Sequence, residues 1–338
     1  MTDPALQLIQ SDTAEKWQQI LADLITDPKE LLEILELDAR QNPLGEHGLE
    51  EFALKAPRPF VARIRKSDWH DPLLLQIWPD QREALASKAL SKDPLQESRF
   101  NAAPGLLHKY QGRVLLTAAP HCAIHCRYCF RRHFDYAANT PGRQQWRQAL
   151  DQIQQDSSIH EVILSGGDPL AASDRLLAWL IDELEAIDHL TTLRIHTRLP
   201  VVIPQRISPP LLELLARTRL RVVLVAHCNH AQELDQAVSG AFSELAAIGV
   251  TLLNQSVLLA EVNDNVDALC KLSDALFAQG VLPYYLHLPD QVAGTSHFQV
   301  QEEQGIALVR AMRARMPGYL VPRLAREIPG ADSKTLLL

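Results

Sequence analysis

Three cysteines within a stretch of eight residues constrain this chain more than any other feature of its sequence. Cys122, Cys126 and Cys129 lie in the segment CAIHCRYC and have the spacing CxxxCxxC. Thiolates packed so closely suit an iron–sulfur cluster. A [4Fe–4S] cube held by three of them keeps one iron open to a small molecule. The spacing therefore predicts a cluster that can bind a ligand.

The same cysteines could instead serve a zinc site or a disulfide. A zinc site usually has four ligands, and His121 or His125 could supply the fourth. A disulfide fits poorly, because the first residues, MTDPALQLIQ, lack the basic and apolar regions of a secretory signal. Cys228 and Cys270 show no paired pattern and are expected to be ordinary buried thiols. A reducing cytoplasm is the expected compartment.

Length and charge narrow the class of protein. The chain has 338 residues, of which 46% are hydrophobic, enough for one α/β barrel with an accessory segment. A net charge of −8 argues against a nucleic-acid partner. No run of about 20 apolar residues predicts a membrane span. We therefore expect neither nucleic acid nor membrane among its partners.

Short apolar runs alternate with amphipathic ones from about residue 112 onward. The runs with strand character are 114–118, 161–164, 193–196, 221–225, 250–257 and 282–287. Helical patterns lie between them, near 143–155, 173–187, 209–217, 231–248 and 265–279. Such alternation predicts a parallel sheet with the helices outside. Six strand–helix units are fewer than the eight of a closed barrel.

The chain divides into three expected parts. Residues 1–100 form an N-terminal helical cap, 101–320 the core and 321–338 a C-terminal tail. In the first part, Trp17 begins an apolar stripe at helical spacing, which core packing explains most simply. No pattern in this part indicates a function.

Polar side chains follow the predicted strands where each strand ends. They are the cysteine loop, Ser165-Gly166-Gly167-Asp168-Pro169, His196, His227, Gln255, His287 and Asp290. In parallel barrels, chemistry gathers at the carboxyl ends of the strands. The glycine pair permits close backbone approach, although by itself it fits an ordinary tight turn equally well. We expect one site at this edge of the sheet.

The cysteine spacing resembles the signature of the radical S-adenosylmethionine (SAM) enzymes. The segments CRYCFRR, around Cys129, and PGADSK, near the end of the chain, resemble the lysine 2,3-aminomutase branch. The resemblance extends from about residue 95 to the end. It implies a partial (β/α)6 radical-SAM barrel within an α/β fold. It also implies a [4Fe–4S] cluster on the three cysteines, with SAM on the open iron, and pyridoxal 5′-phosphate (PLP).

The same resemblance implies which residues hold the cofactors. Lys334 is the catalytic lysine that carries PLP, although a lone tail lysine would ordinarily be solvated. The expected contacts to the PLP phosphate and ring are Lys109, Tyr110 and Arg113. The expected SAM-binding residues are Ser165, Gly166, Gly167, Asp168, His227 and Gln255. The family often has Arg where this chain has Lys109, and Glu where it has Asp168.

Three charged residues are implied to bind the substrate, although each alone would pass for a surface charge. Arg131 matches the arginine that holds the substrate carboxylate, for which a planar guanidinium is suited. Asp290 and Glu327 match two acids that bracket the ε-ammonium of lysine. The second of these acids is usually Asp, so Glu327 is longer by one methylene.

The resemblance implies a 2,3-aminomutase that makes (R)-β-lysine. The chain stops four residues after Lys334 and looks most like the short bacterial members that serve elongation factor P. The expected partners are lysine or elongation factor P, a lysyl ligase and an external electron donor. One alternative is an aminomutase for free L-lysine or another amino acid. A second is a non-catalytic iron–sulfur sensor or redox carrier.

Overall fold

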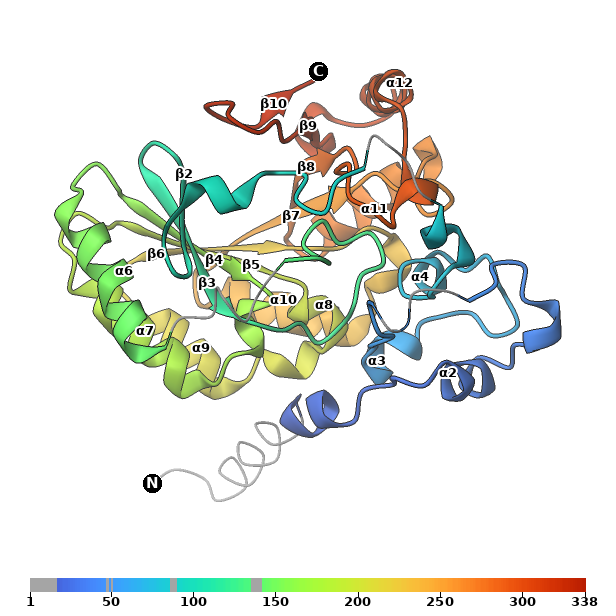
Figure 1. Ribbon diagram of the computed structural model, residues 1–338, viewed down its shortest axis with the longest axis horizontal. Helices are drawn as coiled ribbons and strands as arrows, with labels where there is room; N and C mark the ends of the chain where they lie inside the picture. Colours follow the sequence, from blue (N-terminus) through green and yellow to red (C-terminus); the bar gives the residue numbers. More distant parts are fainter. Residues whose placement is uncertain (1–16, 47–48, 50, 86–89, 135–141) are drawn as a thin grey trace.

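The computed structural model describes residues 17–46, 49, 51–85, 90–134 and 142–338 (Figure 1). Its centre is a ten-stranded sheet in which the strands lie side by side in chain order. The strands are β1 (Asn101–Ala103), β2 (Leu106–Tyr110), β3 (Arg113–Ala119), β4 (Glu161–Gly166), β5 (Thr192–Thr197), β6 (Arg221–Ala226), β7 (Thr251–Val257), β8 (Leu282–His287), β9 (Arg323–Arg326) and β10 (Thr335–Leu336).

The strands from β3 to β9 are all parallel, and antiparallel strands extend the sheet at both edges. There β1 and β2 precede β3, and β10 pairs with β9. Because β1 and β10 each have one neighbour, the sheet stays open. This confirms the predicted partial barrel, and β3–β8 are its six predicted strands. The sequence prediction missed β9, a four-residue strand with arginine at both ends.

The long helices lie outside the sheet, as the alternating pattern predicts (Figure 1). They are α6 (Arg143–Gln155), α7 (Asp174–Glu185), α9 (Pro209–Arg217), α10 (Gln236–Ala247), α11 (Val266–Ala278) and α12 (Glu302–Arg313). Side-chain caps fix several starting points: Ser173, Asp235 and Asn265 each accept a hydrogen bond from the first turn of α7, α10 and α11. The cap Asp235 explains why α10 begins later than the predicted 231. The sequence prediction missed α12.

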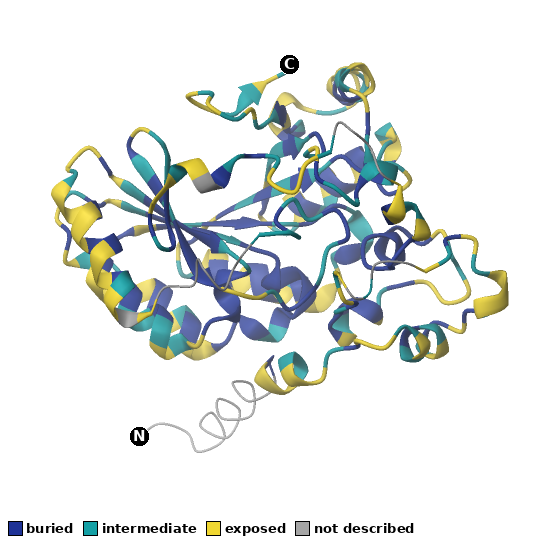
Figure 2. Cartoon of the chain, viewed as in Figure 1, coloured by how far each residue is buried: buried dark blue, intermediate teal, exposed yellow. Residues whose placement is uncertain are grey.

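The core is made by the central strands and the helices that cover them (Figure 2). Leu164, Leu193 and Leu224, on three neighbouring strands, are all fully buried. In β5 and β7 buried residues alternate with partly buried ones, so one face of each of these strands packs into the core. Trp17 belongs to the same hydrophobic core, with only 3% of its surface exposed. The interpretation of its stripe as core packing is confirmed.

The N-terminal segment consists of short helices joined by loops. Residues 17–22 are helical, and then come α2 (Pro28–Ile34), η1 (Ala39–Gln41), α3 (Arg58–Val61), α4 (Pro72–Leu75), η2 (Gln81–Ala84) and η3 (Glu97–Phe100). Residues 1–16 of the predicted cap lie outside the described residues. The division of the chain into three parts stays a prediction. None of the helices among the described residues combines the length and apolarity needed to cross a membrane.

Candidate active site

The cysteine loop follows β3 and lies at the carboxyl ends of the parallel strands. Cys122, Cys126 and Cys129 are free thiols, each partly buried. Burial raises the pKa of Cys129 to about 12, and the neighbouring Cys126 adds to this shift. Burial also raises the pKa of Cys122, with contributions from Asp168 and both other cysteines. The three sulfurs therefore share one electrostatic environment, in which thiolates need a cationic partner.

The side chains around the three cysteines bear on whether this loop holds zinc or an iron–sulfur cluster. The imidazole Nδ1 of His125 lies 2.8 Å from the carbonyl oxygen of Ala53, and its ring stacks on Phe52. The described residues contain no group of three or more His, Cys, Asp and Glu side chains set to hold a metal ion. All five cysteines are free, and Cys228 and Cys270 are buried as predicted. Three thiols in one loop after a parallel strand suit an iron–sulfur cluster with an open iron.

The glycine pair after β4 allows the cysteine loop to pass close to this strand. Gly166 has φ +106°, and a Cβ on Gly167 would lie 2.5 Å from the carbonyl oxygen of His121. The N–H of Gly167 donates to Ala119 O at 2.9 Å, and that of Asp168 donates to His121 O at 3.0 Å. The predicted need for glycine at this turn is confirmed. The turn supports the start of the cysteine loop.

Asp168, a predicted SAM contact, uses its carboxylate within the chain. Oδ1 accepts hydrogen bonds from Leu170 N at 3.0 Å and Thr197 Oγ1 at 2.6 Å. Oδ2 accepts from Arg198 N at 2.7 Å and Leu199 N at 3.0 Å. The side chain therefore ties the end of β4 to the end of β5, a role that the sequence did not reveal. Its SAM contact stays a prediction.

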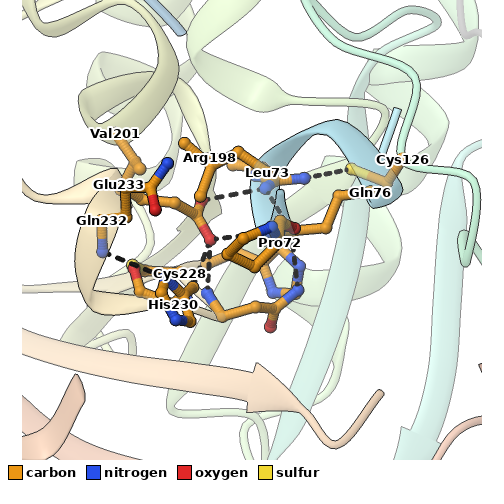
Figure 3. Close-up of polar contacts among 12 residues, drawn as sticks. Pro72, Leu73, Gln76, Cys126, Arg198, Val201, Cys228, His230, Gln232 and Glu233 are labelled. Atoms are coloured by element: carbon orange, nitrogen blue, oxygen red, sulfur yellow. Dashed lines mark hydrogen bonds and ion pairs between the residues drawn. The ribbon is translucent and has the colours of Figure 1, made fainter. Parts of the chain in front are cut away.

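A buried arginine that the sequence prediction missed reaches the cysteine loop (Figure 3). Arg198 follows β5, and its Nη1 donates to Cys126 Sγ at 2.8 Å and to the Tyr128 hydroxyl at 2.8 Å. Its Nη2 donates to Gln76 Oε1 at 2.7 Å and to Glu233 Oε2 at 2.9 Å. Its position directly after a strand is the one sequence signal that could have singled it out.

His227, another predicted SAM contact, continues this chain of hydrogen bonds. Burial lowers its pKa to about 4, and the charge of Arg198 acts in the same direction, so the ring is neutral at pH 7. Nδ1 lies 3.0 Å from the carbonyl oxygen of Gln255, which can only accept. Nδ1 therefore carries the proton, and Nε2 accepts from the Tyr128 hydroxyl at 2.8 Å.

His196, at the end of β5, offers a polar atom that the described residues do not use. Its Nδ1 lies 3.4 Å from the side-chain nitrogen of Gln255, while its buried Nε2 has no hydrogen-bond partner among the described residues. Burial lowers the pKa of His196, and the charges of Arg194, Lys334 and Arg131 lower it further. The buried Nε2 of His196 is therefore a candidate contact for a ligand at the end of β5.

The arginines of the CRYCFRR segment pair with acids of the N-terminal segment. Arg131 forms a two-pronged ion pair with Glu97, at 2.7 Å for Nε and 2.7 Å for Nη2. Its Nη1 lies 3.2 Å from Ser165 Oγ. Arg127 and Arg132 both donate to Glu83. The N-terminal segment thus fixes the cysteine loop, a function that no pattern in it indicated.

The predicted residues of the PLP site, from β2 and from the tail, gather around Glu327, which follows β9. Lys334 Nζ donates to Glu327 Oε2 at 2.8 Å, and Lys109 Nζ and the Tyr110 hydroxyl donate to Oε1. Burial raises the pKa of Glu327, but the charges of Lys334 and Lys109 outweigh it and hold the pKa well below its ordinary range. Because β10 pairs antiparallel with β9, the chain turns back after Glu327 and brings Lys334 to the Glu327 carboxylate.

Two further predicted residues complete this part of the site. Burial raises the pKa of Asp290 to about 7, and the negative charge of Glu327 adds to the shift. The Asp290 carboxylate makes no hydrogen bond or ion pair with the described residues. The Arg113 guanidinium lies 4.7 Å from the centre of the Tyr110 ring and has no carboxylate partner among the described residues. The carboxylate of Asp290 and the guanidinium of Arg113 are therefore available to a ligand.

A partly buried three-cysteine loop at the carboxyl ends of the parallel strands is the arrangement expected of an iron–sulfur protein of the radical SAM class. A family model described as "4Fe-4S single cluster domain" matches residues 111–195. A radical SAM methyltransferase structure from Sphaerobacter thermophilus aligns with a TM-score of 0.49 and 15% identity, over 65% of this chain and 68% of that one.

Named relatives narrow this class. The L-lysine 2,3-aminomutase of Escherichia coli is 48% identical over 330 residues, 97% of this chain and 96% of its own. That of Haemophilus influenzae is 49% identical over 95% of each chain. That of Clostridium subterminale is 33% identical over 94% of this chain and 77% of its own. The chain belongs to the L-lysine 2,3-aminomutase family, whose members are isomerases.

Proposed function

We propose that this enzyme converts L-lysine to (R)-β-lysine, using a [4Fe–4S] cluster, SAM and PLP. When bound, these groups supply the radical that removes hydrogen from the β-carbon and the carrier for the migrating nitrogen. The observation that supports the proposal most is the contact between Lys334 and Glu327 at 2.8 Å. It brings the predicted PLP lysine against one of the two acids expected to bind an ammonium.

The residues around Lys334 fit PLP. Lys109 and Arg113 are cations that suit a phosphate, and the Tyr110 ring lies beside both of them. The Lys334 side chain is 24% exposed, so a ligand can reach it without unfolding the tail. When Lys109 binds phosphate and Lys334 is covalently occupied, Glu327 loses both of its cationic partners. The carboxylate is then available to the substrate.

The substrate ammonium is expected between Asp290 and Glu327. Two neighbouring carboxylates repel each other, which contributes to the raised pKa of Asp290. A cation placed between them relieves this repulsion and favours both ionised forms. The ε-ammonium of lysine is such a cation, whereas glutamate carries an anion at this end. The acid pair therefore favours lysine over acidic amino acids.

The substrate α-carboxylate is assigned to Arg131. In the structure, the carboxylate of Glu97 occupies the two-pronged face of this guanidinium. A substrate carboxylate has the same geometry and charge as this partner, so binding exchanges one carboxylate for another. Arg131 is 8% exposed, and an exchange of this kind keeps a carboxylate against its buried guanidinium.

The product is proposed to serve the modification of elongation factor P. One route acts on free lysine and passes β-lysine to a lysyl ligase; the other acts on lysine already attached to the protein. An external electron donor would reduce the cluster in both routes. The support for this role is the resemblance of the motifs in the chain to the family members that serve elongation factor P. A lysine attached through its carboxyl group offers no α-carboxylate, so only the first route depends on Arg131.

Product analysis tests the substrate directly. The reconstituted enzyme is given free lysine, free glutamate and lysylated elongation factor P side by side, with Arg131→Lys as the matched variant. We expect β-lysine from free lysine, and much less of it from the variant. Preferential rearrangement of glutamate, with activity unchanged by Asp290→Asn and Glu327→Gln, would contradict the proposal. Failure to bind PLP while the cluster is intact would favour the sensor or redox carrier.

A further inference from the structure

Arg198 joins a cluster ligand to a buried acid. Its guanidinium donates to Cys126 Sγ at 2.8 Å and to Glu233 Oε2 at 2.9 Å (Figure 3). Arg198 is 5% exposed and Glu233 is fully buried. An arginine stays charged even here, because its intrinsic pKa is above 12. A fixed positive charge therefore lies against the sulfur of one predicted cluster ligand.

Hydrogen bonds also fix the carboxylate of Glu233. Glu233 Oε1 accepts from the backbone N–H groups of Asn229 at 2.9 Å and His230 at 3.1 Å. Gln76, at the end of α4, donates to the same oxygen at 3.3 Å and accepts from Arg198 at 2.7 Å. Residues from three separate parts of the chain, at Gln76, at Cys126 and Tyr128, and at Glu233, thus fix the guanidinium. This arrangement keeps Nη1 directed at the sulfur.

Charges and hydrogen bonds beside a cluster thiolate control the ease of its reduction. A cation and an N–H donor stabilise the reduced cluster, which carries one more negative charge, and so raise its reduction potential. A buried carboxylate does the opposite. In this site the donor faces the sulfur directly, while Glu233 acts from behind the guanidinium. The two residues therefore influence the same potential with opposite signs.

We propose that Arg198 and Glu233 form a charge pair that sets the reduction potential of the cluster on Cys122, Cys126 and Cys129. Arg198 raises the potential through its hydrogen bond to Cys126, and Glu233 holds Arg198 in place and partly offsets its charge. Both are positioning residues, since neither reaches the reacting atoms of the substrate. The proposal is independent of the substrate and of PLP, because the pair touches only the cluster side of the site.

The test is a redox titration of the reconstituted enzyme, without lysine or PLP, monitored by the electron paramagnetic resonance signal of the reduced cluster. At a fixed potential, Arg198→Gln is expected to raise the ratio of oxidised to reduced cluster about tenfold, equivalent to about 59 mV for one electron. Glu233→Gln keeps the shape of the side chain and removes its charge, so the ratio is expected to fall. Iron content confirms that the cluster is intact in each variant.

Arg206→Gln is the matched control. Arg206 is also a fully buried arginine, but it donates to Leu170 O, Ala172 O and Asp174 instead of a cysteine. It is expected to lower thermal stability without moving the potential. If Arg198→Gln fails to fold, the reduction potential of Glu233→Gln tests the proposal by itself. An unchanged or lowered potential in Glu233→Gln, or shifts of the same sign in both variants, would overturn the proposal.

Discussion

The cluster side and the tail side of this site are built differently. On the cluster side, Arg198 and Glu233 are almost completely buried and linked to several parts of the chain. On the tail side, the side chains of Glu327 and Lys334 are 16% and 24% exposed. The pairing of β9 with a strand of only two residues, β10, brings them together. The ion pair between Arg198 and Glu233 is permanent, whereas Glu327 and Lys334 can exchange their partners.

The energies of the two ion pairs explain this difference. Breaking a fully buried pair by removing one partner costs about 3–5 kcal/mol, because the other charge is left without compensation. A pair with access to water costs less to break, since solvent replaces the partner. Lys109, Glu327 and Lys334 can therefore separate when a phosphate and an ammonium arrive. Four predictions test this comparison, from the largest expected effect to the smallest.

Cys126→Ala is expected to abolish cluster binding and all activity. The other two cysteines cannot hold the cube, so the iron content should fall from about four per chain to a small fraction of that value. Iron analysis and the visible absorption of anaerobically purified protein measure the change. Cys270→Ala, which removes a buried thiol outside the loop, should keep its iron. Active enzyme with stoichiometric zinc in place of iron would contradict the assignment.

Asp290→Asn is expected to raise the KM for lysine by about 100-fold or more, since an ammonium loses a charged partner worth about 3–5 kcal/mol when buried. Steady-state kinetics across lysine concentrations measure the effect. Asp182→Asn, on the exposed face of α7, is the matched control and should behave like the unaltered enzyme. Equal KM values for Asp290→Asn and the control would remove Asp290 from the lysine site.

The pH dependence of lysine binding should report on Asp290. Because its pKa is raised to about 7, the carboxyl is neutral below this pH and gains its charge above it. The affinity for lysine is therefore expected to increase as the pH rises from 6 to 8, and Asp290→Asn should lack this step. The stability of the folded state should change with pH in the opposite direction. Because the pKa of Asp290 is higher in the folded state than in the unfolded state, the free energy of unfolding falls as the pH rises from about 4 to 7. Calorimetric titration of the PLP-loaded enzyme, together with thermal melts, measures both trends.

Glu97→Gln is expected to have the smallest effect and to strengthen lysine binding several-fold. The variant removes the internal carboxylate that competes with the substrate for Arg131. It should also lower thermal stability in the absence of lysine, because the buried ion pair between Arg131 and Glu97 is lost, and added lysine should restore this stability. Glu303→Gln, on α12, is the matched control. A weaker affinity for lysine in Glu97→Gln would instead mean that Glu97 orients Arg131 for the substrate.

Local sequence patterns predicted the scaffold and the cysteine loop. The strands β3–β8 could be predicted from their apolar runs. The N-cap side chains Ser173 and Asn265 lie where helices α7 and α11 begin. The tail residues Glu327 and Lys334 could be named only through the resemblance to a family. The structure brings them together through β9 and β10, which are too short for a periodic signal.

Long-range charge pairs could not be predicted from local pattern. Arg198 and Glu233 are 35 positions apart in the chain, and Arg131 and Glu97 are 34 apart. Charged residues in a sequence usually indicate solvated surface, so burial of these side chains is visible only after folding. The same limit applies to Asp168, whose carboxylate serves the backbone at the end of β5.

The central claim is that the tail places a PLP-bearing lysine beside the substrate acids. The most direct measurement is borohydride reduction of the PLP-loaded enzyme, followed by protease digestion and mass spectrometry of the peptides. The account predicts a pyridoxyl group on Lys334, and no label at this position in Lys334→Ala, which should retain its cluster but lose activity. A label on Lys109 or on any other lysine of the unaltered enzyme would contradict it.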